Sequence, residues 1–73
     1  MKTYTYLIKP AKEISLEQLR KDIMVIEEEF SDEEQPTMLQ IKPAQKGAIL
    51  ITPNKDLISA LLKDKNYILT EQS

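Results

Sequence analysis

The spacing of hydrophobic residues changes along this chain, and these changes constrain its fold more than any other feature. Residues 2–9 are dense in β-branched and aromatic side chains and stop at Pro10, which cannot donate to a strand ladder. Beyond residue 15 the spacing becomes three and four, which gathers apolar side chains on one stripe of a helix. The stripe consists of Leu16, Leu19, Ile23, Ile26 and Phe30. The first part of the chain therefore predicts a strand followed by a helix.

The start of this helix carries a capping signal. Ser15 stands in the N-cap position, and Gln18 follows three residues later, as in a capping box. Ile14 is placed to pack against Leu19 as a hydrophobic staple. We expect the helix to run to about Phe30, because residues 31–36 contain no apolar residue and end in a proline.

The second half of the chain predicts a hairpin, a helix and a last strand. Residues 37–42 and 48–51 are expected as strands, joined by a turn over residues 43–47 that contains the only glycine. Thr52 and Pro53 are interpreted as the N-cap and first residue of a second helix. Its expected apolar side is Leu57, Ile58, Leu61 and Leu62, and its end is marked by Lys63, Lys65 and Asn66. Residues 67–70 read as a fourth strand.

This order of elements is that of the ferredoxin-like fold, an α+β two-layer sandwich with βαββαβ topology. Right-handed crossovers place the first and third strands in the middle of a four-stranded antiparallel sheet, with both helices on one face. The chain has 73 residues and no evident linker, so we expect one domain over residues 1–73.

The composition removes the side chains on which most catalysis depends. The sequence has no His, no Cys and only one Gly, so the usual general base, a thiol nucleophile and a glycine-rich phosphate loop are missing. We therefore expect a protein that is not an enzyme and that uses no cofactor or metal. The lack of Cys, of a signal-peptide core and of a long apolar run leads us to expect a cytoplasmic protein without a membrane segment.

An acidic run is the most unusual local feature. It contains Glu27, Glu28, Glu29, Asp32, Glu33 and Glu34. The run begins in the last turn of a predicted helix and continues beyond it, at the end where the helix dipole disfavours negative charge. One interpretation is a solvated segment that keeps the protein soluble. Another is a surface for a basic protein partner, with contacts from Glu28, Asp32, Glu33 and Glu34. Calcium binding is the third, although the spacing of a calcium loop is missing.

Apolar residues occupy both faces of the first, third and fourth predicted strands. A sheet face that meets only water should be polar. Some of these side chains could lie at strand ends or under a loop. The alternative is that the open face contacts a second copy of the chain or another protein. For that contact surface we expect Tyr4, Tyr6, Leu50 and Leu69.

Nucleic-acid binding is a second hypothesis. Lys46 and Gly47 resemble the start of the third-strand signature of the RNA-recognition motif, but residues 48–51 lack the aromatic side chains on which bases stack. The net charge of −2 also disfavours phosphate binding. A single-stranded nucleic-acid-binding module and a self-associating structural domain remain the alternatives to a protein-binding module.

The stretch over residues 46–71 resembles the second half of subtilisin-type propeptides and the free proteinase inhibitors related to them. The matching features are Gly47 opening a strand, Thr52 and Pro53, Leu57 and Leu61 in the helix, and the closing residues 67–71, with residues 6–9 similar to the first strand. The resemblance implies an inhibitor that packs its open sheet face on a protease and inserts its C-terminal tail, Glu71, Gln72 and Ser73, into the active-site cleft. Ala48 and Ile49 stand where that family has aromatic and small residues. We therefore expect a protein-binding module that acts as an inhibitor or modulator.

Overall fold

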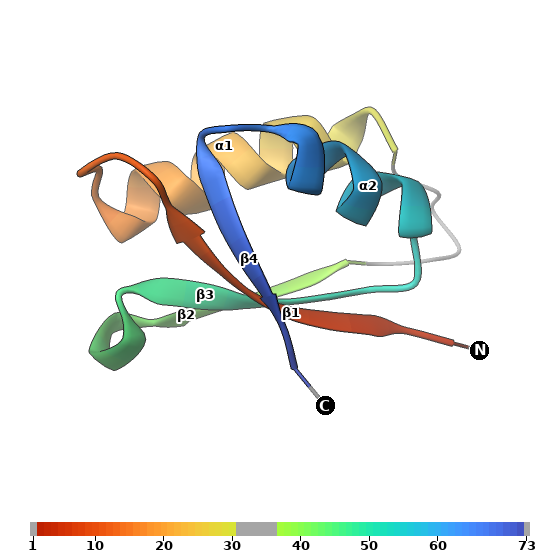
Figure 1. Cartoon of the computed structure of the whole chain (residues 1–73), viewed down its shortest axis with the longest axis horizontal. Coiled ribbons are helices and arrows are strands. Elements are labelled where there is room, and N and C mark those ends of the chain that lie inside the picture. Colours follow the sequence, from red (N-terminus) through yellow and green to blue (C-terminus); the bar gives the residue numbers. More distant parts are fainter. Residues whose placement is uncertain (1, 31–36, 73) are drawn as a thin grey trace.

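Two helices cover one face of a four-stranded antiparallel sheet (Figure 1). A computed structural model of the chain describes residues 2–30 and 37–72. Its elements in chain order are β1 (Tyr4–Pro10), α1 (Leu16–Glu28), β2 (Met38–Lys42), the short 3₁₀ helix η1 (Pro43–Gln45), β3 (Gly47–Thr52), α2 (Lys55–Lys63) and β4 (Tyr67–Glu71).

The strand order of the sheet is β2-β3-β1-β4, with every neighbouring pair antiparallel. The first and third strands therefore lie in the middle, and each helix connects two strands that have a third strand between them. This is the ferredoxin-like arrangement, so the predicted fold class is confirmed. In the pairing of β1 with β3, Ile8 lies opposite Ala48 and Tyr6 opposite Leu50.

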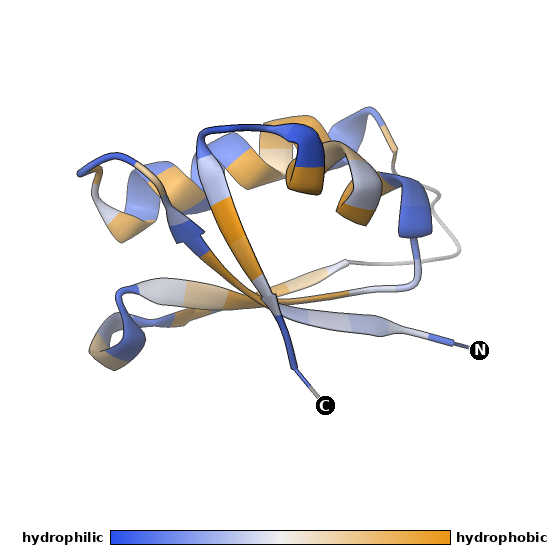
Figure 2. Ribbon diagram, in the orientation of Figure 1, coloured by the Kyte–Doolittle hydropathy of each residue, from blue (hydrophilic) through white to orange (hydrophobic). Residues whose placement is uncertain are grey.

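The core lies between the sheet and the two helices. Its fully or almost fully buried apolar members are Ile8, Leu19, Ile23, Ala48, Leu50, Leu57, Ile58 and Leu61. Apolar and hydrophilic residues alternate along both helices, so each helix has a hydrophobic side (Figure 2). The predicted stripe of the first helix is confirmed, since Leu16, Ile26 and Phe30 also pack against this core. Leu62 was wrongly expected on the apolar side of the second helix, because its side chain is 56% exposed.

The start of α1 is capped as the sequence predicts, but by only half of a capping box. The Ser15 hydroxyl accepts a hydrogen bond from the Gln18 backbone amide at 3.1 Å. The Gln18 side chain does not return to Ser15; it donates instead to the Asp22 carboxylate at 2.8 Å. The helix ends at Glu28, slightly earlier than expected, and its end is closed by the Phe30 amide, which donates to the Glu27 carbonyl at 2.9 Å.

The start of α2 differs from the prediction. Asn54 is the N-cap, and its side-chain oxygen accepts from the backbone amides of Asp56 and Leu57 at 3.0 and 3.3 Å. Thr52 is instead the last residue of β3, and its fully buried hydroxyl accepts from the Asn54 amide at 3.1 Å. The Thr52 and Thr37 hydroxyls also bond to each other at 2.8 Å. Thr52 therefore serves a tertiary contact, which leaves the capping role to Asn54.

Asn54 also connects the two helices. While its oxygen caps α2, its side-chain nitrogen donates to the backbone carbonyl of Phe30, just beyond the end of α1. One side chain thus satisfies groups at the end of one helix and at the start of the other.

Replacing Asn54 should separate these two contributions. We expect Asn54→Ala to lower the free energy of unfolding by about 1–2 kcal/mol, because it removes the N-cap. Asn54→Ser keeps a capping oxygen but loses the donor to Phe30, so it should cost less, about 0.5–1.5 kcal/mol. Urea unfolding followed by circular dichroism measures both. An Asn54→Ala variant as stable as the wild type would show that this link is not structurally important.

Candidate interaction surface

The open face is the face of the sheet opposite the helices. Side chains alternate between the two faces of a strand, so the neighbours of the buried Ile8, Ala48 and Leu50 point away from the core. By this alternation and the strand register, the open face carries Thr5, Leu7, Lys9, Met38, Gln40, Lys42, Gly47, Ile49, Ile51, Ile68 and Thr70.

The centre of the open face is apolar. Leu7 lies opposite Ile49, and Met38 lies opposite Ile51, so the four side chains are neighbours across three strands. We call Leu7, Met38, Ile49 and Ile51 the open-face cluster. Met38 is 64% exposed, and the other three members are half-buried. Ile68, on the edge strand β4, is 55% exposed and lies opposite Lys9.

The four apolar residues expected on this surface lie on the other face. Leu50 is fully buried, and Tyr4, Tyr6 and Leu69 pack against the core beneath the helices. Their placement on the open face was therefore wrong. The reason is the period of two in a strand: Tyr4 and Tyr6 share the parity of the buried Ile8, which turns them towards the helices.

One end of the open face is basic. Lys42 lies opposite Gly47, and Lys9 flanks Gly47 from the other side. A Cβ atom on Gly47 would lie 2.5 Å from the Ile8 carbonyl oxygen and 2.9 Å from Cγ of Lys9, so the close approach of these groups requires glycine. Lys46, in the left-handed conformation with φ of 55°, precedes this glycine. We call Lys9, Lys42 and Lys46 the basic end. Among the described open-face residues there is no carboxylate.

A cavity of about 540 Å³ adjoins the basic end, between the segment that joins β1 to α1 and the η1 turn. Lys9 and Ile68 line it and also belong to the open face. Lys12 and Lys46 add two further positive charges, and Glu13 is the one acidic side chain in its lining. The basic end therefore continues from a flat sheet surface into a concave one.

The expected acidic contact residues are only partly within the described structure. Glu28 is exposed in the last turn of α1. Asp32, Glu33 and Glu34 lie outside the described residues.

The C-terminal tail implied by the family resemblance is paired to β1 at two of its three residues. Glu71 lies in β4 opposite Tyr6, and the Gln72 amide donates to the Thr5 carbonyl at 2.9 Å. Ser73 is also outside the described part.

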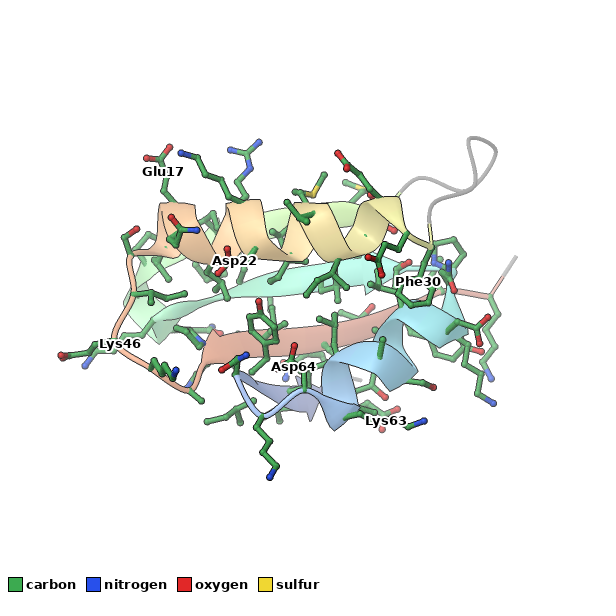
Figure 3. All side chains as sticks on the ribbon, turned by 90° about the horizontal axis from the view of Figure 1, so that it is seen from above. Glu17, Asp22, Phe30, Lys46, Lys63 and Asp64 are labelled. Carbon is green, nitrogen blue, oxygen red and sulfur yellow. The ribbon has the colours of Figure 1, made fainter. Side chains whose placement is uncertain are left out.

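Tyr67 is the residue with the clearest electrostatic perturbation. Burial raises the pKa of its hydroxyl above the ordinary value of 10.0, and the negative charges of Asp22 and Asp64 raise it further. Figure 3 shows these two carboxylates, one on α1 and the other just after α2. Asp22 and Tyr67 also line a smaller cavity of about 220 Å³. Like an ordinary tyrosine, Tyr67 is protonated at neutral pH, and its raised pKa extends the alkaline range over which it keeps the proton.

Neither a metal site nor a membrane span is found in the described residues. Over residues 2–30 and 37–72, no three or more His, Cys, Asp or Glu side chains group as metal ligands. Within the same ranges, no helix has the length and hydrophobicity needed to cross a membrane.

Comparisons with protein-family models, with curated proteins and with solved structures give no match.

The raised pKa of Tyr67 predicts a loss of stability at high pH. Above pH 10 the unfolded chain ionises this tyrosine while the folded protein still holds the proton, so the unfolded state is favoured. The stabilisation is complete below pH 10 and is lost as the pH rises through the folded pKa. A Tyr67→Phe variant should therefore lose less stability than the wild type between neutral and alkaline pH. Urea unfolding at neutral pH and at a pH above 10 measures the free energy of unfolding of both proteins. The same loss of stability in the wild type and in Tyr67→Phe would contradict this prediction.

Proposed function

We propose that this protein is a non-enzymatic module that binds another protein through the open face of its sheet. The observation that carries this proposal is the open-face cluster, which lies on the side of the sheet away from the core, with Met38 exposed and the other three members half-buried. A sheet face that only meets water is normally polar, and contiguous exposed apolar residues mark interaction sites. The helix-covered face already supplies the core, so this second apolar face has no evident role in folding.

The available side-chain chemistry supports binding over catalysis. The sequence provides no His or Cys, and Tyr67, the perturbed tyrosine, is held in its protonated form. The open face itself presents aliphatic, hydroxyl, amide and ammonium groups. Such groups suit contact and orientation, whereas general acid–base chemistry needs groups that titrate near neutral pH.

The position of the tyrosines favours a protein partner over a nucleic acid. Single-stranded nucleic acids bind to sheets through exposed aromatic side chains on which bases stack. Tyr4, Tyr6 and Tyr67 all pack against the core on the helix-covered face. The lysines of the basic end would contact phosphate, but the open face offers no stacking platform.

An inhibitor is one form that such a module takes. The resemblance to subtilisin-type propeptides supports the same use of the open sheet face, packed on the surface of a protease. Glu71 and Gln72 of the implied tail are paired to β1 in this protein. The open face, and not the tail, would therefore provide most of the contact with a protease.

Capture experiments with matched variants test the proposal. Wild-type protein serves as bait in a lysate of its source organism, and captured proteins are quantified by mass spectrometry. A Leu7→Thr/Ile51→Thr variant has a β-branched, strand-favouring residue at both positions but loses apolar contact, so it should reduce capture of the partner at least about tenfold. The control is Leu62→Gln, which changes an exposed leucine on α2 and should leave capture unchanged. Equal capture by all three proteins would contradict the proposal.

Two solution measurements address the alternatives. We expect no measurable binding to single-stranded DNA or RNA at physiological salt. Tight, salt-sensitive binding that Lys42→Ala or Lys46→Ala weakens would favour the nucleic-acid hypothesis instead. Sedimentation equilibrium of the wild type detects self-association, and a stable dimer abolished by Leu7→Thr/Ile51→Thr would assign the open face to a second copy.

A further inference from the structure

We infer that the partner presents a segment that is both apolar and acidic, with its apolar side chains on the open-face cluster and its carboxylates at the basic end. This inference rests on the proposed function and specifies the chemistry of the partner. It follows from the distribution of charge around the apolar centre.

The charges of the described open face have one sign. Lys9 and Lys42 are its charged residues, and Lys46 adjoins them. When a partner covers the apolar centre, it also removes water from the nearby ammonium groups, which is unfavourable unless they gain an opposite charge. A basic partner would add repulsion. A partner that brings carboxylates offsets the desolvation and gains directed hydrogen bonds.

The geometry of the basic end suits a carboxylate. Lys9 and Lys42 belong to β1 and β2, which flank β3 at Gly47 and are separated by two strand spacings, about 9–10 Å. Gly47 has no side chain, and the stem of Lys9 packs closely over it, so the two lysines border the same short stretch of β3. A carboxylate at this end of the open face would therefore meet a lysine from β1 and a lysine from β2.

The adjoining cavity extends this arrangement. Lys9 lines both the open face and the cavity, where Lys12 and Lys46 supply further donors against the single carboxylate of Glu13. Ile68 also lines the cavity and places an apolar surface beside the lysines. A second acidic side chain, or the end of an acidic segment, therefore has a concave surface with net positive charge to enter.

A second copy of this chain fits the basic end less well. In a two-fold symmetric dimer the same surface meets itself. Two open faces brought together would bury four apolar residues from each copy, but both would contribute lysines. The described open face has no carboxylate with which to neutralise them. A different protein with acidic residues supplies what a second copy lacks.

Peptide display provides the test. The full chain is used to select binders from a library of random short peptides, and the enriched sequences are read. We expect enrichment of Asp and Glu together with Leu, Ile or Phe. One selected peptide is then titrated against the wild type and two variants of equal charge: Lys9→Gln/Lys42→Gln at the basic end and Lys55→Gln/Lys63→Gln on the exposed side of α2. The first variant should bind about tenfold more weakly and the second within about twofold of the wild type.

The outcomes separate this inference from the proposed function. The inference is overturned if the selected peptides are not enriched in Asp and Glu. It is also overturned if the two lysine variants weaken peptide binding equally. If such peptides still lose binding in Leu7→Thr/Ile51→Thr, the open face remains the binding surface and only its charge preference is refuted. Peptides insensitive to every open-face variant, or no selected peptide at all, overturn both.

Discussion

The register between β1 and β3 determines which side chains form the core and which form the candidate surface. Ile8 pairs with Ala48 and faces the helices, while Leu7 pairs with Ile49 and faces away. Because side chains alternate along a strand, a shift of one strand by a single residue would exchange its two sets. The pairing of β1 with β3 thus sets the centre of both faces, and the pairing of β2 with β3 adds Met38 and Lys42 to the open face.

Both sets of side chains are apolar at their centres, so the sheet has hydrophobic residues on its two faces and not only on the face that packs against the helices. A sheet whose open face is polar exposes little hydrophobic surface when nothing covers that face. The open face of this sheet is apolar at its centre, so it exposes hydrophobic surface when it is uncovered. The core face buries Ile8, Ala48 and Leu50 completely, whereas Met38 and Ile68 on the open face are more than half exposed. The core therefore lies on one side of the sheet only, and the proposed contact surface rests on the apolar residues of the other side.

The sequence predicts the elements of this fold well because their signals are local. The spacing from Leu16 to Phe30 and the N-cap at Ser15 each involve residues within a few turns of helix, and the structure confirms both. The start of the second helix was misplaced because Thr52 and Pro53 form a good local signal. In the folded protein the Thr52 hydroxyl is used by Thr37 and by the Asn54 backbone, a choice that depends on tertiary contact.

The candidate surface was predicted less well, and for a related reason. Both parities of β1 and β3 are apolar, so hydrophobicity alone does not say whether Leu50 or Ile49 faces the helices. The burial of Ala48 and the close approach at Gly47 decide this, and both appear only when the strands are paired. The basic end brings together Lys9 and Lys42, which are far apart in sequence, so no local motif could have indicated it.

We propose that the open face of the sheet is the surface by which this protein binds its partner. The most direct measurement is methyl NMR of the isotope-labelled wild type, free and bound to the captured partner. We expect the methyl signals of Leu7, Met38, Ile49 and Ile51 to shift or broaden on binding. We also expect those of Val25 and Leu62, which are exposed on the helices, not to change. Perturbed helix methyls together with unchanged signals from the open-face cluster would show that the partner does not bind the open face.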